Sequence, residues 1–233
     1  MEPFDTEPAG LLIHKDFITP AQEAALIQLF QTELTWPERK GRRSLHYGYT
    51  FSYRTFAVDL DVPYAPFPGW LTALLPSDEA GGPRRAPDQV CVQHYPPGTG
   101  IPPHADTHGA FDDRLYALSL GAPVVMQFGR AGGRRVDVDV APRSMMLMRG
   151  DARLHWTHGI RARKTDTLGD VRRPRGDRWS ITYRWLRAGG ECECGDEALC
   201  DTAQRRAGVE RAYRWKEQQQ QLQAGGAAPK EET

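Results

Sequence analysis

The chain has 233 residues, which is enough for one domain with a sizeable buried core. Its 30 Lys and Arg residues equal its 30 Asp and Glu residues, which excludes a global charge signature of nucleic-acid or membrane binding and leaves only a local patch for a polyanion. No run of about 18 apolar residues occurs, and the start MEPFDTEPAG lacks the features of a secretion signal. We therefore expect a soluble intracellular protein without membrane contact, in the cytoplasm and, as a second location, the nucleus.

A strand and a helix are predicted near the N-terminus. The segment GLLIHKDFI, residues 10–18, has the composition of a strand, and residues 1–9 before it are expected to be flexible. The next segment, TPAQEAALIQLF, predicts a helix, because Thr19 and Gln22 fit a capping box and Pro20 suits the first helical position.

An aromatic strand follows the basic run RKGRR. Between residues 45 and 54, every second residue is aromatic, which predicts one strand with four rings on one face: Tyr47, Tyr49, Phe51 and Tyr53. After a proline-rich loop at 62–69, the segment WLTALL predicts a short helix.

The rest of the chain predicts a mainly β structure. Short β-rich segments are separated by Gly, Pro or charged turns: DQVCVQHY, LYALSLG, PVVMQFG, RRVDVDV, SMMLMRG and RWSITYRWLR. This pattern is typical of an all-β sandwich or a jelly roll. A polar helix is predicted over 202–223, and the tail 224–233 is predicted to be disordered.

The segment HADTHGAF, residues 104–111, has the residue types of a metal site. In an extended strand, His104, Asp106 and His108 would point the same way. His158 lies far downstream in LHWTHGI. Two histidines and one carboxylate on one side of an octahedral iron leave three positions open, so His104, Asp106 and His158 are candidate ligands of non-haem iron. An isolated H-x-D pair is more often surface or turn chemistry.

A second motif is RWSITYR, residues 178–184. Alternation places Arg178 and Arg184 on one face of a strand, opposite Trp179, Ile181 and Tyr183. Two buried guanidinium groups need an anion, and a dicarboxylate could pair with both. The alternative is a solvated strand face with ordinary surface arginines.

The cysteines suggest a second metal. The pattern C-x-C-x5-C offers three thiolates, from Cys192, Cys194 and Cys200, and a tetrahedral zinc site needs one more ligand. A histidine from the segment 104–111 would supply it. The alternative is three oxidisable thiols near a flexible end, and Cys91 is expected to be a small core residue.

Together, H-x-D, the distal histidine and R-x5-R resemble the AlkB family of Fe(II)- and 2-oxoglutarate-dependent dioxygenases. HYPPGTGIPPHADTHGAFDD, PRSMMLMRGDARLHWTHGIRARK and CECGDEALC resemble, more narrowly, the branch that hydroxylates the wobble uridine of tRNA. The resemblance covers about residues 10–201. It implies an α+β, mainly β fold, with a double-stranded β-helix (jelly-roll) core, flanking helices and a zinc-tethered C-terminal segment.

The resemblance also implies the site residues and the cofactors. Fe(II) would be held by His104, Asp106 and His158, with dioxygen as co-substrate, and Zn(II) by His108, Cys192, Cys194 and Cys200. The co-substrate 2-oxoglutarate would be held by Tyr95, Arg178 and Arg184. Gln93 is a weaker candidate, because the family usually has asparagine at this position.

The substrate implied by the resemblance is the anticodon loop of tRNA. The segment after RKGRR is similar to a nucleotide-facing lid, which makes Arg43, Tyr47 and Tyr49 candidate substrate contacts. The rings could equally be half-buried core. Further phosphate contacts are expected from residues 161–178 and from the basic C-terminal helix, for which a solvated loop and an exposed helix are the alternatives.

Three functions are compatible with these motifs. The first is hydroxylation of 5-methoxycarbonylmethyluridine at tRNA position 34. The chain has neither an RNA-recognition motif nor a methyltransferase segment, so we expect a separate tRNA methyltransferase to make the ester. The second is oxidative demethylation of N-methylated bases in DNA or RNA. The third is a zinc-stabilised RNA-binding module with little activity.

Overall fold

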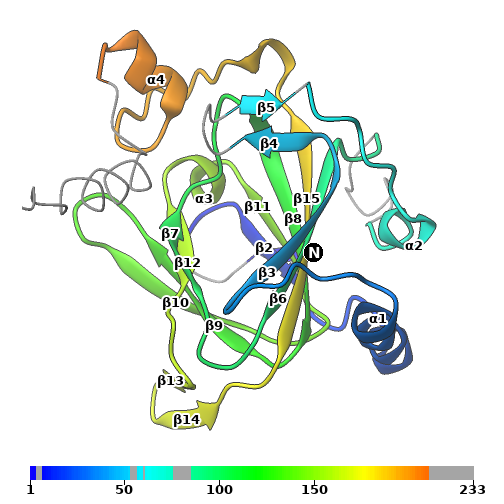
Figure 1. Ribbon diagram of the computed structural model, residues 1–233. Helices are drawn as coiled ribbons and strands as arrows, with labels where there is room; N and C mark the ends of the chain where they lie inside the picture. Colours follow the sequence, from blue (N-terminus) through cyan, green and yellow to red (C-terminus); the bar gives the residue numbers. More distant parts are fainter. Residues whose placement is uncertain (4–6, 53–56, 60, 76–84, 210–233) are drawn as a thin grey trace, which may run out of the picture.

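The protein folds into two antiparallel sheets that pack on each other (Figure 1), as seen in a computed structural model that describes residues 1–3, 7–52, 57–59, 61–75 and 85–209. The larger sheet consists, in spatial order, of β1 (Glu2–Pro3), β2 (Leu11–His14), β11 (Met145–Arg149), β8 (Phe111–Gly121), β15 (Arg178–Leu186), β6 (Gln89–Tyr95) and β3 (Arg43–Gly48). The smaller sheet consists of β10 (Arg135–Val140), β9 (Val124–Gly129), β12 (Thr157–Ile160) and β7 (Ile101–His104).

Two short hairpins, four α-helices and one 3-10 helix, η2 (Ala188–Gly190), complete the described structure. The hairpins are β4 (Thr50–Ser52) with β5 (Ala57–Asp59), and β13 (Thr165–Leu168) with β14 (Val171–Pro174). The helices are α1 (Pro20–Thr32), α2 (Gly69–Thr72), α3 (Asp151–Leu154) and α4 (Asp201–Arg206). None of these described helices combines the length and apolar character that a membrane span requires. The mainly β jelly roll predicted from the sequence is confirmed.

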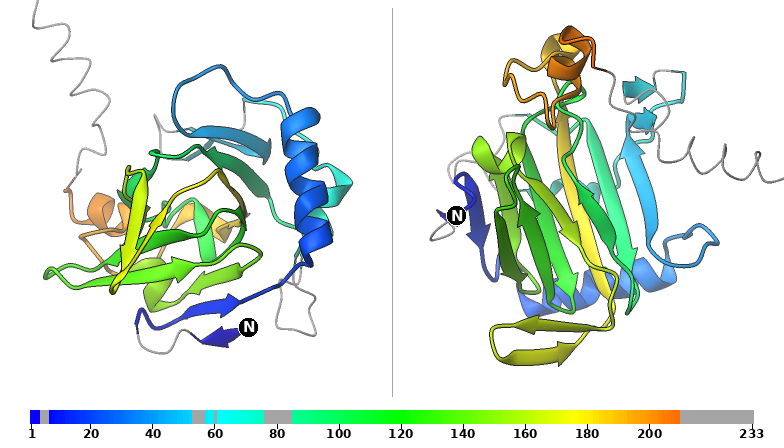
Figure 2. Two further views of the ribbon diagram at one scale, coloured as in Figure 1. Left: turned by 90° about the horizontal axis from the view of Figure 1, so that it is seen from below. Right: turned by 90° about the vertical axis from the view of Figure 1, so that its left-hand side faces the viewer.

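Helix α1 begins where the capping signals predict. The Gln22 N–H donates to the Thr19 hydroxyl at 3.2 Å, and the Gln22 side chain accepts from the Thr19 N–H at 2.8 Å. Its apolar residues Leu26 and Phe30 pack on the outer face of the larger sheet, and Figure 2 shows the helix lying against that sheet. The helix therefore closes one of the two cores.

Alternation along β15 separates these cores. Trp179, Ile181 and Tyr183 belong to the outer core beneath α1. Arg178 and Arg184 belong to the opposite face of the strand, which faces the space between the two sheets. The side-chain directions predicted for RWSITYR are therefore confirmed.

The predicted aromatic strand is divided into two at Gly48. Gly48 has φ +81°, and β3 before it pairs with β6, whereas β4 after it pairs with β5. A Cβ atom at Gly48 would lie 2.1 Å from the Asp88 carbonyl oxygen, so the close approach of these backbones requires glycine. The four rings therefore do not share one strand face, and Tyr53 is outside the described residues.

Other segments also differ from the sequence-based expectations. The basic region 161–178, for which a solvated loop was the alternative to phosphate contacts, contains the hairpin of β13 and β14. The predicted helix 202–223 ends at Arg206, because Gly208 follows at φ +66°, and residues from 210 onward, including the predicted tail, are outside the described residues. Within the N-terminal segment predicted to be flexible, β1 pairs with β2.

Candidate functional site

Three side chains predicted to bind iron converge at the edge of the smaller sheet. His104 ends β7, and His158 is its register partner on the neighbouring strand β12. Their ring centroids are 4.4 Å apart, and Asp106 Oδ1 lies 3.5 Å from His104 Nε2. One possible ligand atom from each residue lies within 4.8 Å of the others. The arrangement offers two nitrogens and one oxygen to a single cation.

The segment 104–108 was expected to be one extended strand, but the structure does not bear this out. Strand β7 ends at His104, so Asp106 and His108 lie in the loop that leads to β8. The loop turns Asp106 toward His104 but His108 toward Cys194, at 3.5 Å between Nδ1 and Sγ. The alternating residues therefore serve two different clusters.

The electrostatics of the triad suit a divalent cation. Burial alone would raise the pKa of the Asp106 carboxyl, but the Arg184 guanidinium and both histidines hold it well below its usual value. Burial and the adjacent His104 lower the pKa of His158 to about 3. At neutral pH, Asp106 is therefore a carboxylate and His158 a neutral imidazole, which are the states that bind a metal.

Arg184 forms an ion pair with one oxygen of the Asp106 carboxylate. Its Nε donates to Asp106 Oδ2 at 2.7 Å, and its Nη1 donates to Gln89 Oε1 at 3.2 Å. Asp106 Oδ1, which faces His104, is left for a cation. The resemblance implied a contact of Arg184 with 2-oxoglutarate and did not predict this contact with Asp106.

The other predicted co-substrate residues lie together on the inner face of β6 and β15. Arg178 is 4% exposed; its Nε donates to Ser119 Oγ at 3.0 Å and its guanidinium lies 5.1 Å from the Tyr95 ring centroid. The Tyr95 hydroxyl donates to Gln93 Oε1 at 2.7 Å. Within the described structure no carboxylate forms an ion pair with Arg178. A buried guanidinium in this state fits an anionic ligand, and Arg178 and Tyr95 line a pocket.

The second cluster joins the loop between β7 and β8 to the segment after β15. Its possible ligand atoms also lie within 4.8 Å of one another, and they belong to His108, Cys192, Cys194 and Cys200. All four cysteines of the chain are free thiols. The 3.5 Å between His108 Nδ1 and Cys194 Sγ agrees with the separation of about 3.6 Å that nitrogen and sulfur ligands have on a tetrahedral zinc.

Protonation states in this cluster also suit a metal. Burial and the charge of Arg153 lower the pKa of His108 to about 4, so its imidazole is neutral. Burial raises the pKa of the Cys194 thiol to about 12. A cation that binds here would therefore displace protons from thiols, as zinc does when it binds cysteine.

Two predicted substrate contacts do not face the triad. Arg43 Nη2 lies 2.6 Å from His94 Nδ1 on the outer face of β3 and β6, and Tyr47 packs against the outer core. The inner face of β3 instead carries His46, whose Nε2 lies 4.0 Å from the buried Cys91 Sγ. Alternation in β3 could be predicted, but which face is inward depends on the register with β6.

Tyr49 and Phe51, the other described aromatic residues of the predicted stripe, contact different partners. Tyr49 contacts Tyr64, with ring centroids 5.1 Å apart. Phe51 contacts Phe111 at 5.3 Å, and the Arg184 guanidinium lies 5.4 Å from the Phe111 ring centroid. Among the described rings of this stripe, Phe51 is therefore the one on the side of the triad.

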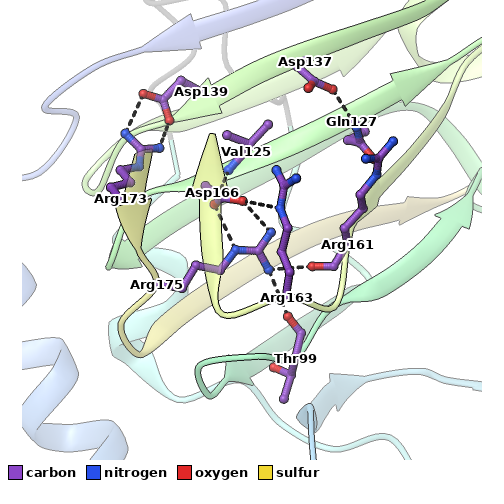
Figure 3. A network of polar contacts seen from close by, with 10 residues as sticks. All are labelled: Thr99, Val125, Gln127, Asp137, Asp139, Arg161, Arg163, Asp166, Arg173 and Arg175. Atoms are coloured by element: carbon purple, nitrogen blue, oxygen red, sulfur yellow. Dashed lines mark hydrogen bonds and ion pairs between the residues drawn. The ribbon is translucent and has the colours of Figure 1, made fainter. Parts of the chain in front are cut away.

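Most arginines of the basic region 161–178 are used inside the protein. Figure 3 shows that Asp166 accepts from both Arg175 and Arg163, and that Arg173 pairs with Asp139. Arg175 also donates to the carbonyl oxygens of Thr99 and Arg161, at 3.2 and 2.6 Å. These contacts hold the β13–β14 hairpin on the smaller sheet, so only the exposed residues of this region are left for phosphate: Arg161, Lys164 and Arg172.

Comparison with known proteins agrees with this geometry. The model of the 2OG-Fe(II) oxygenase superfamily matches residues 10–184. The chain is 37% identical to tRNA (carboxymethyluridine(34)-5-O)-methyltransferase alkbh8 of Xenopus tropicalis, over 84% of this chain and 35% of that protein. It is 33% identical to the alkylated DNA repair protein ALKBH8 homolog of Arabidopsis thaliana, over 84% of this chain and 63% of that protein. The chain thus spans about a third of the length of its vertebrate relatives.

Two further proteins match this chain over most of their own length. Protein L905 of Acanthamoeba polyphaga mimivirus is 31% identical over 75% of this chain and 84% of its own length. The solved structure of OsALKBH1 aligns with a TM-score of 0.57 and 17% identity, over 78% of this chain and 100% of that one, which shows a common fold. The family match includes the triad and both arginines. The chain therefore belongs to the 2OG-Fe(II) oxygenase superfamily, as an AlkB-like 2-oxoglutarate-dependent dioxygenase.

Proposed function

We propose that this dioxygenase hydroxylates 5-methoxycarbonylmethyluridine at the wobble position of tRNA. The observation that carries the proposal is the 37% identity to a relative named for carboxymethyluridine 34 of tRNA, over 84% of this chain. The triad supports the oxygenase chemistry, and the relative supports the substrate. An anticodon base is already largely unstacked, which lowers the cost of presenting it to a pocket.

His104, Asp106 and His158 would hold Fe(II), which with 2-oxoglutarate and dioxygen supplies the oxidising chemistry. Arg184 keeps one Asp106 oxygen engaged, so that the other is directed toward the metal. Arg178 offers a buried positive charge to a carboxylate of 2-oxoglutarate, beside Tyr95. Gln93 orients the Tyr95 hydroxyl by accepting its hydrogen bond.

His108, Cys192, Cys194 and Cys200 would hold Zn(II) in a site with four protein ligands. Such a site is structural, because no position is left open for a substrate. Zinc would attach the segment after β15 to the loop that carries Asp106. The Cys200 Sγ already accepts from the Ala203 N–H at the start of α4, which places this ligand at a fixed helix end.

The anticodon loop of tRNA is the proposed partner, and a separate tRNA methyltransferase is the proposed source of the ester. The proposed substrate already carries the ester, and hydroxylation transfers no methyl group, so another protein would have to make the ester before this one acts. Phe51 and His46 lie on the triad side of their strands and are better placed for the nucleotide than Arg43 or Tyr47.

The proposal is tested by nucleoside mass spectrometry. Ester-modified tRNA is incubated with the protein, Fe(II) and 2-oxoglutarate, beside a His104→Ala control. We expect the wobble nucleoside to gain one oxygen with the native protein and not with the control. An unchanged nucleoside from folded, metal-loaded protein, or equal activity on tRNA that lacks the ester, would contradict the proposal.

A second candidate is oxidative demethylation of N-methylated bases, because one relative is named as an alkylated DNA repair protein. The same triad and arginines would serve this reaction. Release of formaldehyde from methyl-adenine oligonucleotides, at a rate exceeding turnover on ester-modified tRNA, would favour this candidate over hydroxylation.

A further inference from the structure

Arg153 is a buried arginine whose partners are backbone carbonyl groups. It lies in α3, is 2% exposed, and forms no ion pair with a carboxylate of the described structure. Its Nη1 donates to Asp106 O at 2.8 Å, and its Nη2 donates to Thr107 O and Phe111 O at 3.3 Å each. Its Nε donates to Asp112 O at 3.3 Å. A buried guanidinium is costly, and these four bonds offset the cost only while the loop keeps its path.

Two of these carbonyls, those of Asp106 and Thr107, belong to the loop that supplies a ligand to each cluster, and the other two belong to the start of β8 directly after it. Asp106 belongs to the iron triad and His108 to the cysteine cluster. Arg153 binds the backbone of Asp106 itself and of Thr107, the residue between the two ligands. The guanidinium thus fixes the backbone from which both side chains project.

The residues after Arg153 contact the other parts of both clusters. His155 Nδ1 lies 2.7 Å from the carboxylate of Asp196, which is between Cys194 and Cys200 in the sequence. His158, three residues further, is the third member of the triad. The short segment 153–158 therefore contacts the shared loop, the cysteine segment and the iron triad.

We propose that Arg153 is a positioning residue that couples the two metal sites, so that a cation bound at one site strengthens cation binding at the other. The inference rests on the proposed metal ligation of both clusters. A cation that orders His108 also orders the loop backbone held by Arg153, and with it Asp106. Coupling of this kind is reciprocal, since each ion must change the affinity of the other by the same factor.

The direction in which Arg153→Met changes metal affinity distinguishes a positioning role of Arg153 from a role of its charge. A guanidinium beside two cation sites repels cations, so a role through charge alone predicts that Arg153→Met tightens metal binding. A positioning role predicts the opposite, because the loop loses its two hydrogen bonds from Arg153 and the start of β8 loses two more. Loss of an outer partner of a metal ligand typically weakens metal binding by about 10- to 100-fold.

The experiment uses zinc-loaded native protein, Arg153→Met, Arg153→Lys and the control Arg143→Met. Arg143 joins the start of α1 to the β10–β11 turn through Asp16 and Glu23, away from both clusters. Free Mn(II) is titrated by electron paramagnetic resonance to give its dissociation constant at the triad. Release of zinc to a chelator is timed with and without saturating Mn(II) and 2-oxoglutarate.

We expect Mn(II) to bind Arg153→Met about 10- to 100-fold more weakly than the native protein, and the control to bind it normally. Mn(II) should slow zinc release from the native protein and from the control but not from Arg153→Met. Arg153→Lys keeps the charge but not the planar fork, so it should also lose coupling. If Arg153→Met does not fold, Arg153→Lys decides the result.

Unchanged or tighter Mn(II) binding by a folded Arg153 variant would overturn the inference. A rate of zinc release from the native protein that does not change when Mn(II) is added would also overturn it. Either outcome leaves the proposed function intact. A native protein that binds neither Mn(II) at the triad nor zinc at the cysteines would instead contradict the proposed function itself.

Discussion

Arg178 shows how one side chain can be assigned before its ligand is seen. Its guanidinium is buried between Ser119 and the Tyr95 ring, and no carboxylate of the described structure forms an ion pair with it. Arg184, six residues along the same strand, is engaged with Asp106. The two arginines of one motif therefore have different partners in the described structure, and we propose Arg178 as a residue that pairs with a carboxylate of 2-oxoglutarate.

We expect Arg178→Lys to raise the KM for 2-oxoglutarate by about 10- to 100-fold, with a smaller effect on kcat. An ammonium group cannot reproduce the bidentate pairing of a guanidinium with a carboxylate, and a hydrogen bond to a charged group is worth about 1.5–3 kcal/mol. Succinate production measured against 2-oxoglutarate concentration checks this. Arg173→Lys, at an arginine paired with Asp139, is the matched control. An equal KM in both variants would remove Arg178 from the co-substrate site.

Ionisation of the Asp166 carboxyl makes the stability of the fold depend on pH. Burial would raise the pKa of this carboxyl, but hydrogen bonds from Arg175, the Val125 N–H and Arg163 lower it below the usual value. Because the pKa is lower in the folded state, the carboxylate stabilises the protein above the unfolded pKa of about 4, and this contribution is lost as the pH falls through the folded pKa.

The Asp166→Asn variant should therefore be less stable than the native protein at pH 7, and the difference should shrink at pH 3. Asparagine cannot titrate, and it leaves the buried Arg175 without a charged partner. Urea unfolding at the two pH values measures the difference. A gap between the two proteins that stays constant with pH would show that this carboxylate does not control the acid sensitivity.

Strands and helices were predictable where side-chain pattern alone decides them. The capping box of α1 and the alternation of β15 depend on residues close in sequence, and both are confirmed. The end of β7 and the break between β3 and β4 depend on distant partners, namely Arg153 and Asp201 for the first and Ala65 and Asp88 for the second. No local pattern contains these partners.

The same reason limits what the sequence tells about the site. The residue types of the triad and of the cysteines suggested two metal sites, because metal chemistry restricts the ligands. That His108 meets the cysteines and not the triad came from the resemblance to the AlkB family and not from the spacing, and the structure brings these residues together. Arg153 could not be predicted, because backbone carbonyls are present at every residue and leave no signature. Arg43 and Tyr47 required the register of β3 with β6, which only the folded sheet supplies.

Gly48 is predicted to be essential to the β3–β4 break, and Gly41 provides a matched control. Both have positive φ, but a Cβ atom at Gly41 meets nothing within 4 Å, whereas at Gly48 it would lie 2.1 Å from Asp88 O. We expect Gly41→Ala to lower the free energy of unfolding by about 1–2 kcal/mol and Gly48→Ala by more than about 3 kcal/mol, because the backbone must move. Equal losses in denaturant unfolding would show that only the φ angle matters.

The two metal clusters and the two ends of the jelly roll define the organisation of the molecule. Figure 1 places α4 and the cysteine segment at one end and the β13–β14 hairpin at the other. Ion pairs of Asp166 and Asp139 hold the hairpin end. At the other end, the buried residues of the segment 188–206 are the proposed ligands Cys192 and Cys200 and the polar residues Thr202 and Gln204, so this segment has no buried aliphatic or aromatic side chain. Zinc would therefore replace a hydrophobic core at that end.

Loss of the zinc site should release the C-terminal end of the described structure and leave the jelly roll folded. In Cys194→Ala, we expect no bound zinc, a lower melting temperature, and faster amide hydrogen exchange in residues 188–206. Amides of β6, β8 and β15, which lie in the centre of the larger sheet, should stay protected. Cys91→Ala is the control, because this cysteine is buried in β6, away from the cluster. A melting temperature and exchange pattern equal to those of native protein would exclude a structural zinc, since its binding free energy is folding free energy.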